Sequence, residues 1–307
     1  MVAIAVAHPT RESKRVNFRP IEESNSPPII QLMRAPSFSR SRPVWLVACV
    51  GLLFVAGCGG VAGPTCGSGS GAACTRILFL GNSYTYVNDL PSTFAQLARS
   101  AGRPVDIAMV ANGGETLAQH ASSTESLDKI ASRSWSYVVL QDQSETPATL
   151  AGRDYYTYPA ARTIAARVES AGAVPMLFMT WAHRDGLPGA GLAGYESMQQ
   201  QLDAAYLGIA HELKVPVAPV GFTWYAVRLD HPDIQLWADD GSHPSLAGTY
   251  LAACVFFASV FRQSPEGLSF HGGVSDEQAL VLQAEVQAQV RHGGEAQAHF
   301  AEAGELR

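Results

Sequence analysis

A serine, an aspartate and a histidine stand in two short turns of this sequence, and these side-chain types together can activate a hydroxyl group. Ser83 follows an apolar run in "FLGNSYTY" (79–86), while Asp240 and His243 lie in "DDGSHPS" (239–245). A serine hydroxyl needs a base within hydrogen-bond reach, and that base needs a third group to orient it. With His243 as base and Asp240 as orienting carboxylate, the pattern predicts nucleophilic catalysis by Ser83.

The spacing of the second turn supports this interpretation. Asp240 precedes His243 by three positions, and Pro244 then opens a helix, where its missing N–H costs nothing. The turn would let the carboxylate hold one ring nitrogen while the other faces Ser83. Taken separately, serine is common in turns that end strands and aspartate is common as a helix cap. The two turns in combination favour catalysis.

The elements that must position these residues follow from an alternation of patterns. Short runs that are apolar throughout indicate strands covered on both faces, which in alternation with helices predicts a parallel sheet between helical layers. We therefore predict an α/β three-layer sandwich with a doubly wound, mostly five-stranded parallel sheet of flavodoxin-like type. The runs span 76–81, 104–111, 137–141, 174–181 and 215–220, and the helical patterns lie near 90–102, 116–132, 154–171, 193–213 and 245–262. Ligands bind beyond the carboxyl ends of such strands, where these turns fall.

Over about residues 75–262 the chain resembles the SGNH or GDSL-type hydrolase superfamily, as a divergent branch. The sequence Gly81-Asn82-Ser83-Tyr84-Thr85 stands where the family has its G-D-S block, and Asp240-x-x-His243 is similar to the closing block. Between them, "ANGGETL" (111–117) matches the family's glycine block. "LQDQS" (140–144) stands where the family has G-x-N-D.

The resemblance implies an oxyanion hole and a reaction class. The family's donors are the serine N–H, a glycine N–H and an asparagine side chain; here Gly114, with Gly113 next, and Gln143 take the last two places, and a shift of the alignment would instead select Gln141 or Asp142. Asn82 replaces the family's aspartate, a change expected to affect loop support. The implied activity is an esterase or acylhydrolase working through an acyl-serine, often on acetylated sugars or lipids, with no metal and no organic cofactor.

Other residues near the strand ends are candidates for binding. Trp181 and Trp237 are predicted to line the substrate site, since aromatic rings form sugar platforms and acyl walls, although core packing is an alternative. His183 follows the fourth strand and either binds substrate or lies in a surface loop. No C-x-x-C pair occurs, so cysteines do not indicate a metal site.

The amino terminus predicts export. Residues 1–43 are polar and basic, and the 14 apolar residues 44–57 are shorter than the roughly 20 that a membrane-spanning helix needs. The tetrad ending at Cys58 resembles the bacterial lipobox, whose cysteine is lipidated. We therefore expect residues 1–57 to be a signal peptide region, with Met33 as the expected true start, and the mature protein to be a lipoprotein anchored to the cell envelope.

The remaining boundaries follow from composition. Residues 58–74 are rich in Gly, Ser and Ala and predict a flexible lipidated tether, in which Cys66 and Cys74 could pair. Residues 75–263 form the predicted hydrolase-like domain, with Cys254 as a buried thiol. Residues 264–307 are a predicted helical extension and tail without assigned chemistry.

Charge excludes one class of partner. The net charge is −6, and removal of residues 1–57, with seven of 21 basic and three of 27 acidic residues, would leave 14 against 24 and a net charge of −10. Nucleic acid is therefore not an expected partner. The expected partners are a small-molecule or glycan ester and, through the lipid anchor, a membrane; no oligomeric state is specified.

Two alternatives remain open at the level of sequence. An acyltransferase would use the same site to pass the acyl group to a sugar hydroxyl instead of water. A non-catalytic surface glycan-binding protein would keep the scaffold, and the replacements at Asn82 and Gln143 add weight to that alternative.

Overall fold

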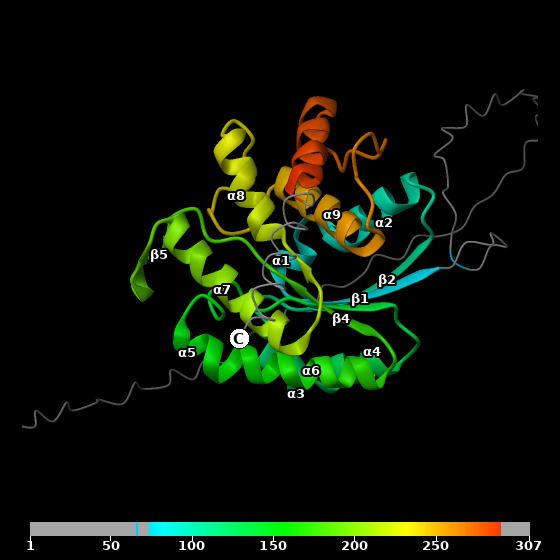
Figure 1. The fold of residues 1–307 in the computed structure, drawn as a ribbon, viewed down its shortest axis with the longest axis vertical. Coiled ribbons are helices and arrows are strands. Elements are labelled where there is room, and N and C mark those ends of the chain that lie inside the picture. The colour runs from blue at the N-terminus through cyan, green and yellow to red at the C-terminus, as the bar shows by residue number, and fades with distance from the viewer. Residues whose placement is uncertain (1–65, 67–73, 290–307) are drawn as a thin grey trace, which may run out of the picture. The chain divides into compact units, whose positions relative to one another are not determined.

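A computed structural model describes Cys66 and residues 74–289 of the chain. Its central feature is a five-stranded sheet, all parallel, in the order β2-β1-β3-β4-β7 (Figure 1). The strands are β1 (Thr75–Gly81), β2 (Val105–Ala111), β3 (Tyr137–Leu140), β4 (Val174–Phe178) and β7 (Val217–Ala218). The predicted α/β fold is confirmed, and the strand order is that of flavodoxin-like doubly wound sheets.

Helices cover both faces of the sheet. In Figure 1, α2 and α9 lie on one side, whereas α3, α4 and α6 lie on the other. The helices are α1 (Ser83–Tyr86), α2 (Leu90–Ser100), α3 (Leu117–Ser122), α4 (Thr124–Ala131), α5 (Leu150–Gly152), α6 (Tyr158–Ser170), α7 (Tyr195–Leu213), α8 (Val220–Asp230) and α9 (Leu246–Phe261). Shorter elements are η1 (Val87–Asp89), the π-helical turn η2 (Arg153–Thr157), η3 (Pro188–Ala190) and an antiparallel pair, β5 (Gly186–Leu187) with β6 (Leu192–Ala193).

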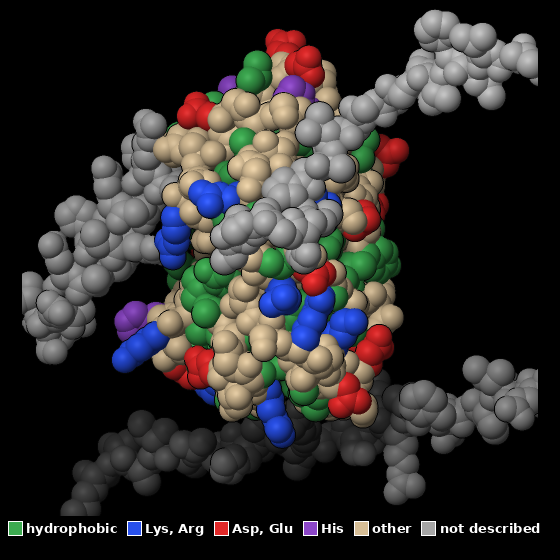
Figure 2. Space-filling view, turned by 90° about the vertical axis from the view of Figure 1, so that its right-hand side faces the viewer, with side chains coloured by type: hydrophobic (Ala, Val, Ile, Leu, Met, Phe, Trp, Pro, Cys, Tyr) green, Lys and Arg blue, Asp and Glu red, His purple; other side chains and the backbone are tan. Residues whose placement is uncertain are grey.

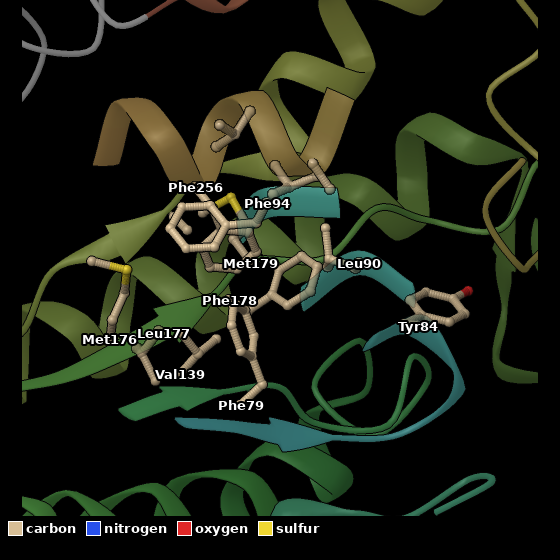
Figure 3. Packing of buried hydrophobic residues seen from close by; sticks show 14 of the residues in the cluster. Phe79, Tyr84, Leu90, Phe94, Val139, Met176, Leu177, Phe178, Met179 and Phe256 are labelled. Atoms are coloured by element: carbon tan, nitrogen blue, oxygen red, sulfur yellow. The ribbon is translucent and has the colours of Figure 1, made fainter. Parts of the chain in front are cut away.

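The core explains why the strand sequences are apolar throughout. Residues 77–80 of β1 are fully buried, because helices pack on both of its faces. Phe79, Phe94, Phe178 and Phe256 meet edge to face, with ring centroids between 4.9 and 6.4 Å apart (Figure 3). Such geometry is favoured by the quadrupole of the rings. This cluster joins β1 and β4 to α2 and α9 and fixes the sheet edge at which the candidate residues lie.

Three local predictions need correction. β4 ends at Phe178, so Trp181 stands in a loop and not at the end of a strand. The helix expected near 116–132 is two helices, because Ser123 ends α3 and its side chain caps α4 by accepting from Ser126 N. A further helix, α8, was not predicted, since its apolar residues lie around much of its circumference.

The stretch after residue 263 shares the core of the preceding domain. A helix at 276–289 buries Ala279, Leu282 and Val286 completely in the same hydrophobic cluster. Gln283 donates to Tyr250 Oη at 2.7 Å and to Leu268 O at 2.9 Å. Residues 264–289 are therefore packed against α9 and are not a separate appendage.

The cysteines of the described region are paired or buried. Cys66 and Cys74 form a disulfide, which confirms that prediction, and Cys254 is a buried free thiol within α9. The predicted signal peptide region 1–57 and the lipidation site Cys58 lie outside the described residues, as do 67–73 and 290–307.

The surface carries charges of both signs. The face in Figure 2 shows basic and acidic side chains interspersed among apolar ones. Within residues 74–289, no helix combines the length and the hydropathy that crossing a bilayer requires.

Candidate active site

The turn that carries Ser83 is a sharp connection from β1 into α1. Gly81 ends the strand, Asn82 caps the helix by accepting from Tyr84 N at 3.1 Å, and Ser83 is the first helical residue. A Cβ atom at position 81 would overlap Thr85 Oγ1 and Gln141 Oε1. Glycine is therefore required here by the close approach of neighbouring side chains.

Asn82 and Gln141 interlock beneath the serine. The Asn82 N–H donates to Gln141 Oε1 at 2.8 Å, and Gln141 Nε2 returns a bond to Asn82 Oδ1 at 2.9 Å. Asn82 Nδ2 also donates to Glu115 O at 2.9 Å. Both side chains are buried, so these amides are fully engaged in joining the ends of β1 and β3 to the glycine loop. Asn82 supports the loop, as expected, and Gln141 has no free group for substrate.

His120 is a supporting residue that the sequence did not identify. Its buried ring places Nε2 2.9 Å from Gly81 O and Nδ1 2.8 Å from Ser126 Oγ. A carbonyl oxygen can only accept, so Nε2 donates to Gly81 O. Its only signal was a histidine on a helix adjoining the glycine block, which is too common to be diagnostic.

Ser83, His243 and Asp240 form one hydrogen-bonded chain across 160 positions of sequence. His243 Nε2 lies 2.9 Å from Ser83 Oγ, and His243 Nδ1 lies 2.5 Å from Asp240 Oδ2. Asp240 Oδ1 accepts the backbone N–H groups of Ser242 and His243, both at 2.9 Å. The bond from Ser242 N, with those from His243, lowers the pKa of Asp240 to about 2. An ionised carboxylate accepts Nδ1–H, which leaves Nε2 free to accept the serine proton.

Two tryptophans fasten the triad turn from behind, contrary to the prediction that they line the site. Trp181 Nε1 donates to Ser242 O at 2.9 Å, and Trp237 Nε1 donates to Ala182 O at 3.1 Å. Trp181 is fully buried and stacked between Tyr84 and Trp224, with centroids 4.5 and 4.0 Å away. It has no open face for a sugar or an acyl chain.

Trp237 also lies in packing contact with other rings. It meets Tyr195 and Trp224 edge to face, at centroid distances of 5.5 and 5.3 Å. Neither tryptophan borders the cavity at Ser83. The alternative of core packing therefore describes both residues, and their indole N–H groups hold loops in place.

A cavity of about 380 Å³ opens beside Ser83 and gathers most of the predicted residues. Ser83, His243, Gly114 and Gln143 all border it, with Gly113 beside them, whereas Asp240 lies behind His243. Gly114 has φ +69°, a left-handed conformation that favours glycine. Among the described residues, the lining is Asn82, Ser83, Tyr84, Tyr86, Gly113, Gly114, Gln143, Ser144, Glu145, His183, Ser242 and His243.

Hydrogen bonds accepted by its side-chain oxygen orient the amide of Gln143. Oε1 accepts from Glu145 N at 2.9 Å and from Thr146 N and Oγ1 at 3.0 and 3.1 Å. Its Nε2 has one long contact, 3.3 Å to Ser144 Oγ. Because the oxygen is held by three donors, the NH₂ end retains a hydrogen available for a ligand in the cavity.

Asp142 is structural and does not border the cavity. Its buried carboxylate accepts from Leu117 N and Gln143 N at 2.8 Å and from Thr157 Oγ1 at 2.6 Å. Burial raises its pKa. These bonds tie the start of α3, and hence the glycine loop, to the segment that carries Gln143.

A second hollow lies away from the triad. It measures about 480 Å³ and is bordered by residues of α4 and α6, such as Leu127 and Arg167, and by Arg133 in the segment after α4. Arg133 is already paired with Asp106 and lies over the ring of Trp135. Across the described residues, no group of three or more His, Cys, Asp or Glu side chains could hold a metal ion.

Comparisons with known proteins place this geometry on a known scaffold. No family model matches the chain, and no curated protein matches it. Among solved structures, a candidate SGNH hydrolase from Slackia heliotrinireducens is 28% identical, with a TM-score of 0.52, over 61% of this chain and 100% of that one. A DUF4886 family protein from Bacteroides uniformis is 17% identical, with a TM-score of 0.61, over 72% and 96% of the two chains.

An acetyl xylan esterase is also similar in fold, at 13% identity and a TM-score of 0.51, over 60% of this chain and 99% of that one. The structural neighbours thus include a candidate SGNH hydrolase and acetyl xylan esterases at low identity. The five-stranded parallel sheet with flanking helices is the fold of SGNH hydrolase structures.

Proposed function

We propose that this protein is a serine esterase that cleaves a short-chain ester through an acyl-serine intermediate. The single observation that carries the proposal is the hydrogen-bonded chain from Asp240 through His243 to Ser83 Oγ at the wall of a cavity. The similarity in fold to SGNH esterases supports the reaction class.

The proposed mechanism gives each step to a residue of the site. Ser83 Oγ attacks the ester carbonyl carbon while His243 Nε2 takes its proton, and the Asp240 carboxylate stabilises the imidazolium. The carbonyl oxygen becomes an oxyanion, for which Ser83 N–H, Gly114 N–H and Gln143 Nε2 are the proposed donors. His243 then protonates the departing alcohol. Water, deprotonated by His243, attacks the acyl-serine and releases the acid.

The cavity lining favours a short acyl group. Apart from the rings of Tyr84 and Tyr86, the bordering side chains are hydroxyls, amides, imidazoles, a carboxylate and glycines. Among the described residues, no Leu, Ile, Val, Phe or Met borders the cavity, so a long hydrocarbon chain would find little apolar surface to contact there. Acetyl or similarly small esters of polar alcohols fit this lining best.

The test combines labelling with turnover. A fluorophosphonate probe should label Ser83 in the wild type and fail to label Ser83→Ala or His243→Ala, and hydrolysis of 4-nitrophenyl acetate should follow the same pattern. Folded protein that is neither labelled nor active on short esters would reject the esterase and favour a non-catalytic glycan-binding protein. Acyl transfer to an added sugar in preference to water would instead identify an acyltransferase.

We also propose that the protein is exported and lipid-anchored, with residues 1–57 as signal region and 58–74 as tether. The disulfide between Cys66 and Cys74 supports an oxidising compartment. Amino-terminal mapping of the mature protein should find Cys58 as the first residue, carrying lipid, and Cys58→Ser should release the protein from membranes. Export that requires residues 1–32 would contradict Met33 as the start.

A further inference from the structure

A second histidine borders the cavity without belonging to the triad. His183 is half-buried, and its Nε2 lies 3.0 Å from Ser144 Oγ, another residue of the lining. It forms no hydrogen bond with Ser83, Asp240 or His243 in the described structure. The proposed mechanism therefore leaves this imidazole without a role.

The loop that carries His183 is held from two sides, by α7 and by the triad turn. Ala182 N donates to Gln199 Oε1 at 2.7 Å, and His183 N contacts Met198 Sδ at 3.4 Å, both residues of α7. Arg184 N donates to Gly241 O in the triad turn at 2.7 Å. These contacts fix the backbone that carries His183, and the bond from Nε2 to Ser144 Oγ orients its ring.

The chemistry of the ring suits recognition of a hydroxyl group. Burial lowers the pKa of His183, so at neutral pH the ring is uncharged and has one donor and one acceptor nitrogen. Nε2 is engaged with Ser144. Nδ1 has no partner among the hydrogen bonds of the described residues and is not enclosed, so it is accessible to a ligand.

The surrounding wall has the same character. Ser144, Glu145 and Ser242 border the cavity together with His183, and Ser242 Oγ lies 2.8 Å from Tyr84 Oη. The wall thus offers hydroxyl oxygens, a carboxylate and an imidazole near the nucleophile. The hydroxyls of a polyol can form hydrogen bonds with groups of this kind, whereas a hydrocarbon would leave them without hydrogen-bond partners.

We propose that His183, held by Ser144, is a specificity-determining residue that hydrogen-bonds a hydroxyl of the alcohol part of the ester. The preferred substrates are then short-chain esters of polyhydroxylated rings, the carbohydrate class, with a free hydroxyl near the ester. This inference rests on the proposed esterase function and adds to it the substrate class and the residue that selects it.

Two esters with the same acyl group and ring size make the test specific. Methyl xyloside monoacetate has free hydroxyls beside the ester, and cyclohexyl acetate has a six-membered ring without them. The measured quantity is the ratio of kcat/KM for the sugar ester to that for cyclohexyl acetate. For His183→Leu the ratio should fall at least tenfold, because the hydroxyl then meets an apolar side chain.

Companion variants separate recognition from structure. His183→Asn keeps a polar group near the Nδ1 position and should recover part of the ratio, and Ser144→Ala should lower the ratio by loosening the ring. His211→Leu makes the same substitution on an exposed face of α7 and should leave the ratio unchanged. If His183→Leu does not fold, Ser144→Ala carries the test.

The outcomes distinguish this inference from the function on which it rests. A wild type that is not labelled at Ser83 and cleaves neither ester would overturn the esterase proposal itself. An active wild type whose ratio is unchanged in His183→Leu and Ser144→Ala, or whose two kcat/KM values fall equally, would overturn only the role of His183.

Discussion

The serine and the histidine of the candidate triad lie in regions of opposite character. The turn that carries Ser83 is interlocked by buried amides of Asn82 and Gln141 and by the buried ring of His120. In the turn 238–243, by contrast, the side chains of His243 and Asp240 are 36% and 49% exposed. The proposed nucleophile is thus fixed by the core, while the proposed acid–base pair is fixed by a local turn and by hydrogen bonds from the tryptophan side.

This difference suggests that substitutions in the serine turn affect mainly stability and that substitutions in the exposed turn affect mainly the proposed chemistry. A buried polar network costs free energy when any member is left unpaired, so the serine turn is sensitive to changes that touch no substrate. The side chains of the other turn are more exposed, and they are the groups proposed to move protons. Variants in the two regions should therefore separate activity from stability.

The largest expected effect is in the exposed turn. His243→Ala should lower kcat by about 10⁴-fold or more, because a triad member acts as a unit with its partners. The free energy of unfolding should change by less than about 1 kcal/mol, since a partly exposed side chain with two hydrogen bonds is removed. Ester turnover and chemical denaturation measure the two quantities; a variant that keeps a tenth of wild-type kcat would contradict the assignment.

Gln143→Glu should have the next largest effect. The carboxylate keeps an oxygen to accept from Glu145 N and Thr146 N, but it loses the proposed oxyanion donor. Removal of one such donor typically costs about 10²–10³-fold in kcat. Steady-state kinetics on 4-nitrophenyl acetate would measure this loss, and a kcat within threefold of wild type would show that Gln143 is not a donor.

Asn82→Asp should affect stability more than activity, which is the opposite of the result expected for His243→Ala. The substitution restores the residue type expected from the family resemblance, but a carboxylate cannot donate to Glu115 O and would be buried beside it. We expect a loss of about 2–3 kcal/mol in the free energy of unfolding, with a smaller effect on kcat than that of His243→Ala. Equal stability of variant and wild type at pH 7 would show that the interlock is dispensable.

A pH-dependent effect should arise from a carboxyl behind the exposed turn. The Asp203 carboxylate accepts a hydrogen bond from Gln199 Nε2 at 2.8 Å. Gln199 Oε1 in turn accepts the N–H of Ala182, and the carbonyl of Ala182 accepts from Trp237 Nε1. Burial raises the pKa of Asp203 from 3.8 to about 6. The folded state then binds the proton more tightly than the unfolded chain, so stability falls as pH rises from 4 to 6 and stays lower above.

Asp203→Asn should remove the loss of stability caused by ionisation of Asp203, while it keeps an oxygen that accepts from Gln199 Nε2. Relative to wild type, the variant should gain of the order of 2 kcal/mol in unfolding free energy at pH 7.5 and almost nothing at pH 4. Denaturation at the two pH values gives the comparison. A gain of the same size at both would assign the effect to something other than ionisation.

The smallest expected effect is that of Trp181→Phe. The ring can still stack between Tyr84 and Trp224, while the N–H that holds Ser242 O is lost. One neutral hydrogen bond is worth about 1 kcal/mol, and we expect kcat to fall about fivefold with little change in KM. A rise in KM for sugar esters alone would instead return Trp181 to the substrate-binding role that its burial argues against.

Sequence alone was sufficient for what depends on local chemistry. Continuous apolar runs specified five parallel strands, because strands covered on both faces have no polar side. The spacing of Asp240 and His243 specified their contact, since residues three apart in a turn are within reach of each other. The glycine block, Gln143 and Ser83 were placed at one sheet edge by their positions after strands, and the structure brings them to one cavity.

Tertiary structure decided what depends on contacts between distant segments. Trp181 lies in the loop after β4 and Trp237 lies just before the triad turn, yet both rings are packed against other aromatic rings, those of Tyr84, Tyr195 and Trp224. Tertiary contacts also decide the supporting roles of His120 and Gln141. The same is true of the place of His183 beside the cavity. Residue type and spacing determine which groups a turn can present, but burial is a property of the assembled layers, and burial decides whether a side chain faces substrate or core.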